Sequence, residues 1–139
     1  MACDMIIAAR EAQFAQPEVS LGVMPDWGGS YRLAMLIGPN RAKEMFFTGK
    51  MISADQGYNW GLINHVCSKE EIDEAINHIV SEIKKNDTKV LGHVKEIINR
   101  HTQEGVQHNA FEETTTSAIC MTSLSTQQRL NNFFAARKG

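Results

Sequence analysis

The sequence lacks the features that mark membrane, secreted and nucleic-acid-binding proteins. None of its apolar runs approaches the roughly 20 residues that a membrane-spanning helix needs. Asp4 stands where a signal peptide would carry basic residues, and the apolar run of residues 5–9 is too short for the core of such a peptide. The formal net charge of -2 gives no reason to expect a polyanionic partner. These absences predict a soluble cytoplasmic protein that binds neither membrane nor nucleic acid.

Paired cysteines are also lacking. Cys3, Cys67 and Cys120 are odd in number and nowhere adopt CxxC spacing. This argues against a disulfide framework and against a zinc site, and it predicts free thiols in a reducing compartment. The 5 histidines are scattered without a ligand spacing, so we expect no metal site.

What is present is the composition of an ordinary globular domain, with 42% apolar and 22% charged residues in a chain of 139. Short apolar runs predict strands at residues 5–9, 12–15 and 62–67. Capping and stop signals predict helices from Gly28 to Gly38-Pro39, from Asn40 to Gly49, from Ser53 to Gly61, from Ser68 to Lys85, from Thr88 to a break near Gly105, over residues 106–121, and from a cap at Ser125 or Thr126 onward. A composition shift near Asn86-Asp87 separates residues 1–84, of mixed α/β character, from residues 85–139, which are helical.

The stretch of residues 16–30 carries the candidate chemistry. Glu18 and Asp26 each follow a proline, whose fixed φ and missing N–H stiffen the chain before the acid. Gly28 and Gly29 then open a helix. Glu18 is either a site carboxylate or a surface residue after a turn. Asp26 is either an acid–base group or an Asx-type turn residue that caps the helix.

A combined pattern runs through nearly the whole chain. It comprises Met5-Ile6-Ile7-Ala8-Ala9, Gln13-Phe14-Ala15-Gln16-Pro17-Glu18-Val19, Leu21-Gly22, Pro25-Asp26-Trp27-Gly28-Gly29-Ser30, Ile52-Ser53-Ala54, Gly61-Leu62-Ile63, and Phe133 with Arg137-Lys138. The pattern resembles the crotonase family, the enoyl-CoA hydratases and isomerases. No single piece is specific, but the combination is.

The resemblance implies an α/β fold, the C-terminal portion of a crotonase-like spiral, in which short strands are followed by a mainly helical region. Residues 1–84 would form the later part of the spiral core with the carboxylates of an acyl-CoA site. Residues 85–139 would form an oligomerisation region that builds a homo-oligomer, a trimer or hexamer. The family's oxyanion turn and the first of two hydratase glutamates would precede Met1, so the resemblance implies a truncated or cleaved fragment.

The resemblance also implies a chemistry. Two backbone N–H groups polarise an acyl-CoA thioester and stabilise an enolate. Glu18 stands at the second catalytic glutamate of hydratases, which donates a proton to the α-carbon and helps to hold the water. Coenzyme A enters as part of the substrate, with no metal and no other cofactor. The alternative is an inert fragment that keeps only the oligomerisation surface.

Asp26 departs from the hydratase pattern. Hydratases have Pro-Gly-Ala-Gly-Gly where this chain has Pro25-Asp26-Trp27-Gly28-Gly29. An aspartate at this position is found in some isomerase-like members and in a dehalogenase branch, where it attacks the ring. With Asp26 as the acid–base group, isomerisation by double-bond migration is therefore as credible as hydration. A thioester hydrolase or dehalogenase that uses Asp26 as nucleophile is a further alternative.

Two further groups of residues follow from the resemblance. Those expected to line the substrate pocket are Pro17, Leu21, Trp27 and Gly28. The alternative for Trp27 is packing in the core, and the alternative for Gly28 is a tightly packed helix start; both alternatives are the more ordinary ones. Those expected at the adenine and phosphate end of coenzyme A are Phe133 and Lys138. Helix packing for Phe133 and a solvated tail for Lys138 are the alternatives.

Overall fold

The computed structural model describes residues 1–102 and 106–136, so the predicted helix break near Gly105 lies outside the described residues. The strands are β1 (Ile7–Ala9), β2 (Gln13–Phe14), β3 (Ile52–Ser53) and β4 (His65–Cys67). The 3-10 helices are η1 (Glu18–Leu21) and η2 (Lys69–Glu71). The α-helices are α1 (Gly29–Ile37), α2 (Pro39–Thr48), α3 (Ala54–Trp60), α4 (Ile72–Lys84), α5 (Thr88–Thr102), α6 (Val106–Met121) and α7 (Leu124–Ala136).

The strands pair across long stretches of sequence. β1 runs parallel to β4 with Ala8 opposite Val66, and β2 runs antiparallel to β3 with Phe14 opposite Ile52. A parallel pair needs a crossover connection, and here α1, α2 and α3 supply it. Residues 15–28 connect β2 to α1 and belong to neither strand pair. Both candidate carboxylates lie on this connection.

A compact apolar core lies between these strands and the first three α-helices. Its buried side chains all come from residues 8–63 and are Ala8, Leu33, Ile37, Ala42, Met45, Ile52, Ala54, Leu62 and Ile63. α1 packs against α2. The break between the two helices is set by Gly38, which has a φ of 81°, and by Pro39, which begins α2. Gly38-Pro39 ends the first helix, as the sequence predicts, and Pro39 also starts the next one.

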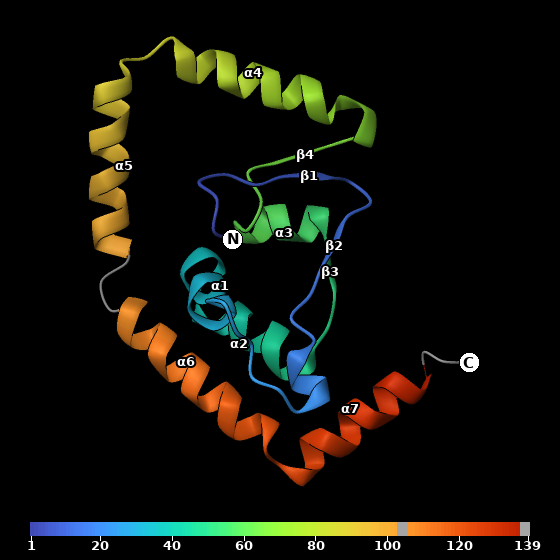
Figure 1. The fold of residues 1–139 in the computed structure, drawn as a ribbon. Helices are drawn as coiled ribbons and strands as arrows, with labels where there is room; N and C mark the ends of the chain where they lie inside the picture. Colours follow the sequence, from blue (N-terminus) through green and yellow to red (C-terminus); the bar gives the residue numbers. More distant parts are fainter. Residues whose placement is uncertain (103–105, 137–139) are drawn as a thin grey trace.

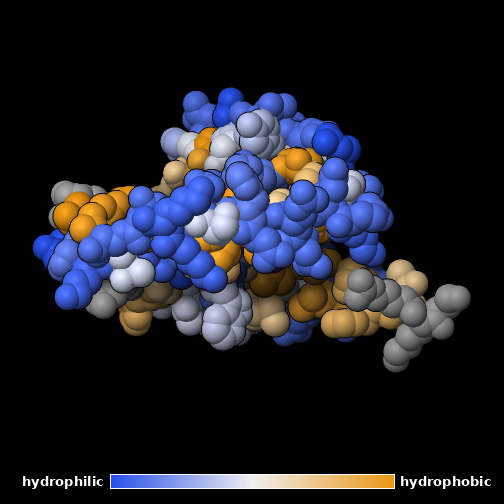
Figure 2. Space-filling view, turned by 90° about the horizontal axis from the view of Figure 1, so that it is seen from above, coloured by the Kyte–Doolittle hydropathy of each residue, from blue (hydrophilic) through white to orange (hydrophobic). Residues whose placement is uncertain are grey.

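The four C-terminal helices form an open arc around this core (Figure 1). α4 contacts β1, α6 contacts α1, and α7 contacts η1. None of the described side chains of α4 and α5 is buried, and seven of their apolar residues are 39–58% exposed. Orange apolar patches interrupt the polar surface in Figure 2. No helix among the described residues is long and apolar enough to cross a membrane.

Local capping signals are confirmed where both partners lie within one turn. Ser68 and Glu71 form a capping box, and the Ser68 N–H donates to Oε2 of Glu71 at 3.0 Å. The hydrogen bonds from the Ser68 side chain and backbone lower the pKa of Glu71. At the start of α3, Oγ of Ser53 accepts the Gln56 N–H at 3.1 Å. Both starts agree with the predicted ones.

Two predicted caps are wrong. α2 has Gly38 at its cap and Pro39 as its first residue, so it begins one residue before the predicted cap at Asn40. Proline fits this first position because the N–H that it lacks would have had no partner in the helix. The last helix is capped by Ser123 instead of residue 125 or 126, since Oγ of Ser123 accepts the Thr126 N–H at 3.1 Å.

Candidate active site

Glu18 opens η1, and one of its carboxylate oxygens is buried without a partner. Pro17 precedes it at the cap position, and Gly22 ends η1 in the left-handed conformation with a φ of 75°. Oε2 of Glu18 is shielded from solvent and makes no hydrogen bond among the described residues. Leaving a buried acceptor unpaired costs about 1–3 kcal/mol, so native structures rarely do so. Such an oxygen marks a place where a water or ligand group can bind.

Asp26 begins a tight turn that leads into α1. The Gly29 N–H donates to the Asp26 carbonyl at 3.2 Å, and both central residues, Trp27 (φ 60°) and Gly28 (φ 82°), have positive φ, as in a type I′ turn. Oδ1 of Asp26 accepts the Trp27 N–H at 2.9 Å. The expectation that Trp27 fills the core is wrong, since the turn directs this side chain outward and leaves it 92% exposed.

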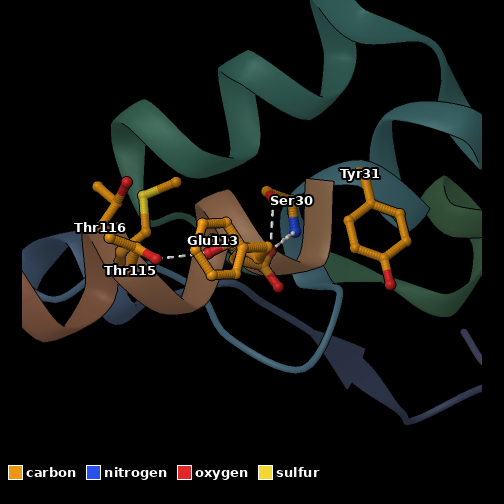
Figure 3. A pocket seen from close by; sticks show the side chains of 7 residues that line it. Ser30, Tyr31, Glu113, Thr115 and Thr116 are labelled. Carbon is orange, nitrogen blue, oxygen red and sulfur yellow. Dashed lines mark hydrogen bonds between the residues drawn. The ribbon is translucent and has the colours of Figure 1, made fainter. Parts of the chain in front are cut away.

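A buried glutamate caps the helix that follows this turn. Glu113 lies on α6 and is 3% exposed. Its Oε2 accepts the Gly28 N–H at 2.6 Å, and its Oε1 accepts the Ser30 N–H at 3.0 Å and the Ser30 hydroxyl (Figure 3). A carboxylate here satisfies two helix-start N–H groups and suits the positive end of the helix dipole. The capping role that the sequence offered to Asp26 therefore belongs to Glu113.

Helix α7 holds the other end of the connection. Thr126 is 2% exposed, and its Oγ1 donates to the Gly22 carbonyl at 2.7 Å. Nη1 of Arg129 donates to the Ser20 carbonyl at 3.1 Å. A Cβ on Gly22 would lie 2.8 Å from Oγ1 of Thr126, so glycine is required here by close approach as well as by its positive φ.

Two cavities border Glu113. One of about 620 Å³ lies between α1 and α6, and its walls include Ser30, Tyr31 and Thr116 (Figure 3). The other, of about 380 Å³, is lined by the Asp26 turn with Tyr31, Arg32, Ala110 and Thr114. The structure thus brings Asp26, Trp27 and Gly28 to one cavity. Glu18 lines neither cavity.

The remaining predicted site residues lie near η1 or beyond the described chain. Pro17 is exposed and Leu21 is half-buried. Phe133 is half-buried on α7, the helix that contacts η1, and meets Phe134 edge to face with ring centroids 5.6 Å apart. Lys138 lies outside the described residues.

The sequence did not single out Glu113, and it offered Thr126 only as a possible cap of its own helix. Glu113 stands between Glu112 and a run of three threonines, where the ordinary expectation is a solvated face. Its partners are 83 and 85 residues away, and that of Thr126 is 104 residues away. The one sequence signal for these contacts was a polar residue inside a helix whose apolar residues follow only a weak periodic pattern.

The polar groups of this region are carboxylates, hydroxyls and backbone N–H groups. Among the described residues, no three His, Cys, Asp or Glu side chains gather as metal ligands do. A carboxylate with a free buried oxygen can accept or return a proton. The arrangement is therefore suited to general acid–base chemistry.

Comparison with known proteins identifies the family. The family model described as "Enoyl-CoA hydratase/isomerase" matches residues 1–138. A short-chain-enoyl-CoA hydratase of Clostridioides difficile is 34% identical over 133 residues, which are 96% of this chain and 86% of the relative. A crotonyl-CoA hydratase of Syntrophomonas wolfei is 32% identical over 138 residues, 99% of this chain and 53% of the relative.

The fold is also found among solved structures. An enoyl-CoA hydratase from Mycobacterium avium subsp. paratuberculosis shares it with a TM-score of 0.91 and 22% identity, over 96% of this chain and 55% of that one. The expected crotonase-like fold is confirmed, although at this identity the likeness concerns the fold alone. The chain spans about half the length of the Syntrophomonas relative and of this structure. The match of the family model along the chain, together with the two sequence relatives, shows that the chain belongs to the enoyl-CoA hydratase/isomerase family.

Proposed function

We propose that this chain supplies the carboxylates of an acyl-CoA site, which hydrates or isomerises an enoyl-CoA thioester. The names of the Clostridioides and Syntrophomonas relatives support hydration. The single observation that carries the proposal is the buried, unpartnered Oε2 of Glu18. A general acid–base group needs an oxygen that is free to take and return a proton, and Glu18 has one at the position where the family resemblance expects it.

In the proposed hydration, the oxygen of a water adds to the β-carbon of a 2-enoyl thioester, and a proton is delivered to the α-carbon of the resulting enolate. Glu18 holds the water and transfers the proton. The family resemblance assigns the oxyanion N–H donors to a segment that comes earlier in the family's order, so the reaction requires that segment in the same molecule or complex. Coenzyme A serves as the carrier of the acyl group, and Phe133 contacts its adenine end.

Glu18→Gln tests this assignment because it keeps the shape of the side chain and removes the proton acceptor. We expect kcat for crotonyl-CoA hydration, followed by loss of the enoyl-thioester absorbance, to fall by about 10²–10⁴-fold. The folded state should be no less stable, because an unpaired buried carboxylate oxygen has been replaced by a neutral group. Glu11→Gln changes an exposed glutamate nearby and serves as the matched control. Equal rates for the two variants would refute the assignment.

Asp26 decides between the reaction classes. Asp26→Asn can still accept the Trp27 N–H through its side-chain oxygen, so the turn should remain. If only a 3-enoyl-CoA is converted, and Asp26→Asn abolishes this while Glu18→Gln does not, the reaction is isomerisation. Release of free coenzyme A thiol that Asp26→Asn removes would indicate the hydrolytic alternative. A folded chain that converts none of these substrates would be the inert alternative.

We also propose that the chain forms a homo-oligomer, a trimer or hexamer, through exposed apolar residues of α5. Val90, Val94, Ile97 and Ile98 leave 48–58% of their surface exposed on this helix. Val94→Lys should lower the solution mass measured by light scattering, whereas Glu96→Lys, which places the same residue elsewhere on α5, should not. A monomeric wild-type chain would refute this assembly.

A further inference from the structure

The connection between Glu18 and Ser30 is held at both ends by helices that lie far along the chain. At its second end, Glu113 of α6 accepts the N–H groups of Gly28 and Ser30, 85 and 83 residues away. At its first end, Thr126 of α7 donates to the Gly22 carbonyl, 104 residues away. Glu18 and Asp26 each stand close to one of these two anchors.

At each anchor, the backbone of the connection also bonds to itself. Val23 N–H donates to the Glu18 carbonyl at 3.1 Å, and Gly29 N–H donates to the Asp26 carbonyl at 3.2 Å. Such local bonds fix the shape of each turn without fixing where the turn lies relative to the core. The long-range bonds from Glu113 and Thr126 supply that second constraint.

We infer that α6 and α7 form the frame of the active site, in which Glu113 and Thr126 are positioning residues for Asp26 and Glu18. The helical region that the sequence assigned to oligomerisation would then also serve catalysis. The inference rests on the proposed function in one respect, because the position of a carboxylate affects catalysis only if the site catalyses a reaction.

The chemistry of the Glu113 contact explains why this role needs a carboxylate. Both oxygens are used as acceptors, Oε2 by Gly28 and Oε1 by Ser30. A glutamine has the same shape but offers one acceptor oxygen, and its NH₂ group would face an N–H donor. Glu113→Gln therefore releases one of the two anchored amides and leaves the volume of the side chain unchanged.

The main experiment compares Glu113→Gln with Glu96→Gln, which removes an exposed carboxylate from α5. We expect Glu113→Gln to lower kcat for crotonyl-CoA by roughly 10- to 100-fold with little change in KM, because misplaced catalytic groups slow the chemical step. Amide exchange at Gly28 or Ser30, measured by NMR, should become about tenfold faster or more, since bonds to charged groups are among the stronger ones. Glu96→Gln should change neither measurement.

Thr126 gives an independent test should Glu113→Gln fail to fold. Thr126→Val removes the hydroxyl that donates to Gly22, whereas Thr126→Ser retains it. We expect the valine variant to lower kcat and the serine variant to restore most of it. A valine variant as active as wild type would overturn the role of Thr126.

The two proposals fail in different ways. If wild type converts no enoyl thioester in a molecule or complex that contains the oxyanion segment, the proposed function fails, and amide exchange alone tests the inference. Unchanged exchange at Gly28 and Ser30 in Glu113→Gln then overturns the inference, and faster exchange supports it. If wild type is active and Glu113→Gln exchanges faster but keeps its kcat, Glu113 is structural and the inference is also overturned.

Discussion

Replacing Trp27 by glycine should stabilise the folded chain although it removes a large aromatic side chain. Trp27 is 92% exposed, so its removal takes almost no apolar surface out of the core. Its φ of 60° costs a residue with a Cβ about 1–2 kcal/mol, and glycine escapes this cost. The greater freedom of glycine in the unfolded chain costs about 0.5–1 kcal/mol. The difference is a gain of about 0–1.5 kcal/mol in the free energy of unfolding, with a midpoint of about 0.75 kcal/mol.

The assay is equilibrium unfolding in urea, followed by far-ultraviolet circular dichroism. Trp27→Ala is the matched control, because it removes the same side chain but keeps a Cβ at positive φ. We expect the order of stability Gly > Asn > Ala at this position, since asparagine tolerates the left-handed conformation better than alanine. The dependence of the unfolding free energy on urea should be equal in all three variants, because the surface exposed on unfolding is unchanged. A glycine variant no more stable than the alanine variant would show that the turn is not strained.

The same variant separates stability from function. A bulky residue held in a strained, exposed conformation is more often found at functional sites than elsewhere. If Trp27 walls the acyl pocket, as the family resemblance implies, Trp27→Gly should be more stable and yet turn over enoyl-CoA more slowly. A glycine variant with wild-type kcat and KM would remove Trp27 from the substrate pocket.

Three further predictions concern stability alone. The pKa of Glu71 is lowered in the folded state from its ordinary value of 4.5. The stability that this carboxylate contributes is therefore present above pH 4.5 and is lost as the pH falls through the folded pKa. Glu71→Gln should flatten the acid limb of a stability–pH curve. Leu33→Ala in the core should cost about 2–5 kcal/mol in urea unfolding, because Leu33 is 1% exposed. Gly92→Ala on α5 should stabilise by about 0.5–1 kcal/mol, because a Cβ there meets nothing within 4 Å; a loss of stability would contradict this.

Sequence patterns predicted the elements whose determinants lie close together in the chain. The Gly38-Pro39 break between α1 and α2 and the capping box of Ser68 with Glu71 each depend on residues within one helical turn. Strands β1, β2 and β4 were predicted because apolar runs bounded by polar residues fit a buried strand, and each proved shorter than its run; β3 was not predicted. At these positions, neighbouring residues determine where a helix or strand begins and ends, and distant parts of the chain change this little.

Prediction failed where a distant segment competes for the same polar groups. Thr126 was expected to be a possible cap of its own helix, but its hydroxyl donates to Gly22 instead and Ser123 takes the cap. Asp26 was expected to be a possible cap of α1, but Glu113 occupies that position from 85 residues away. A single sequence carries no signal for such pairings, because each partner is an ordinary polar residue in its own neighbourhood.

The strength of the apolar pattern does not indicate which C-terminal helices carry buried side chains. α4 and α5 have the clearer apolar stripes, yet none of their described side chains is buried. Among the described side chains of the weakly patterned α6 and α7, the buried ones, Glu113, Ser117 and Thr126, are all polar. Their attachment to the candidate site therefore depends on hydrogen bonds to backbone, which a search for apolar periodicity cannot detect. The exposed stripes of α4 and α5 remain available for contacts with other chains, so the two halves of the helical region can serve assembly and site geometry separately.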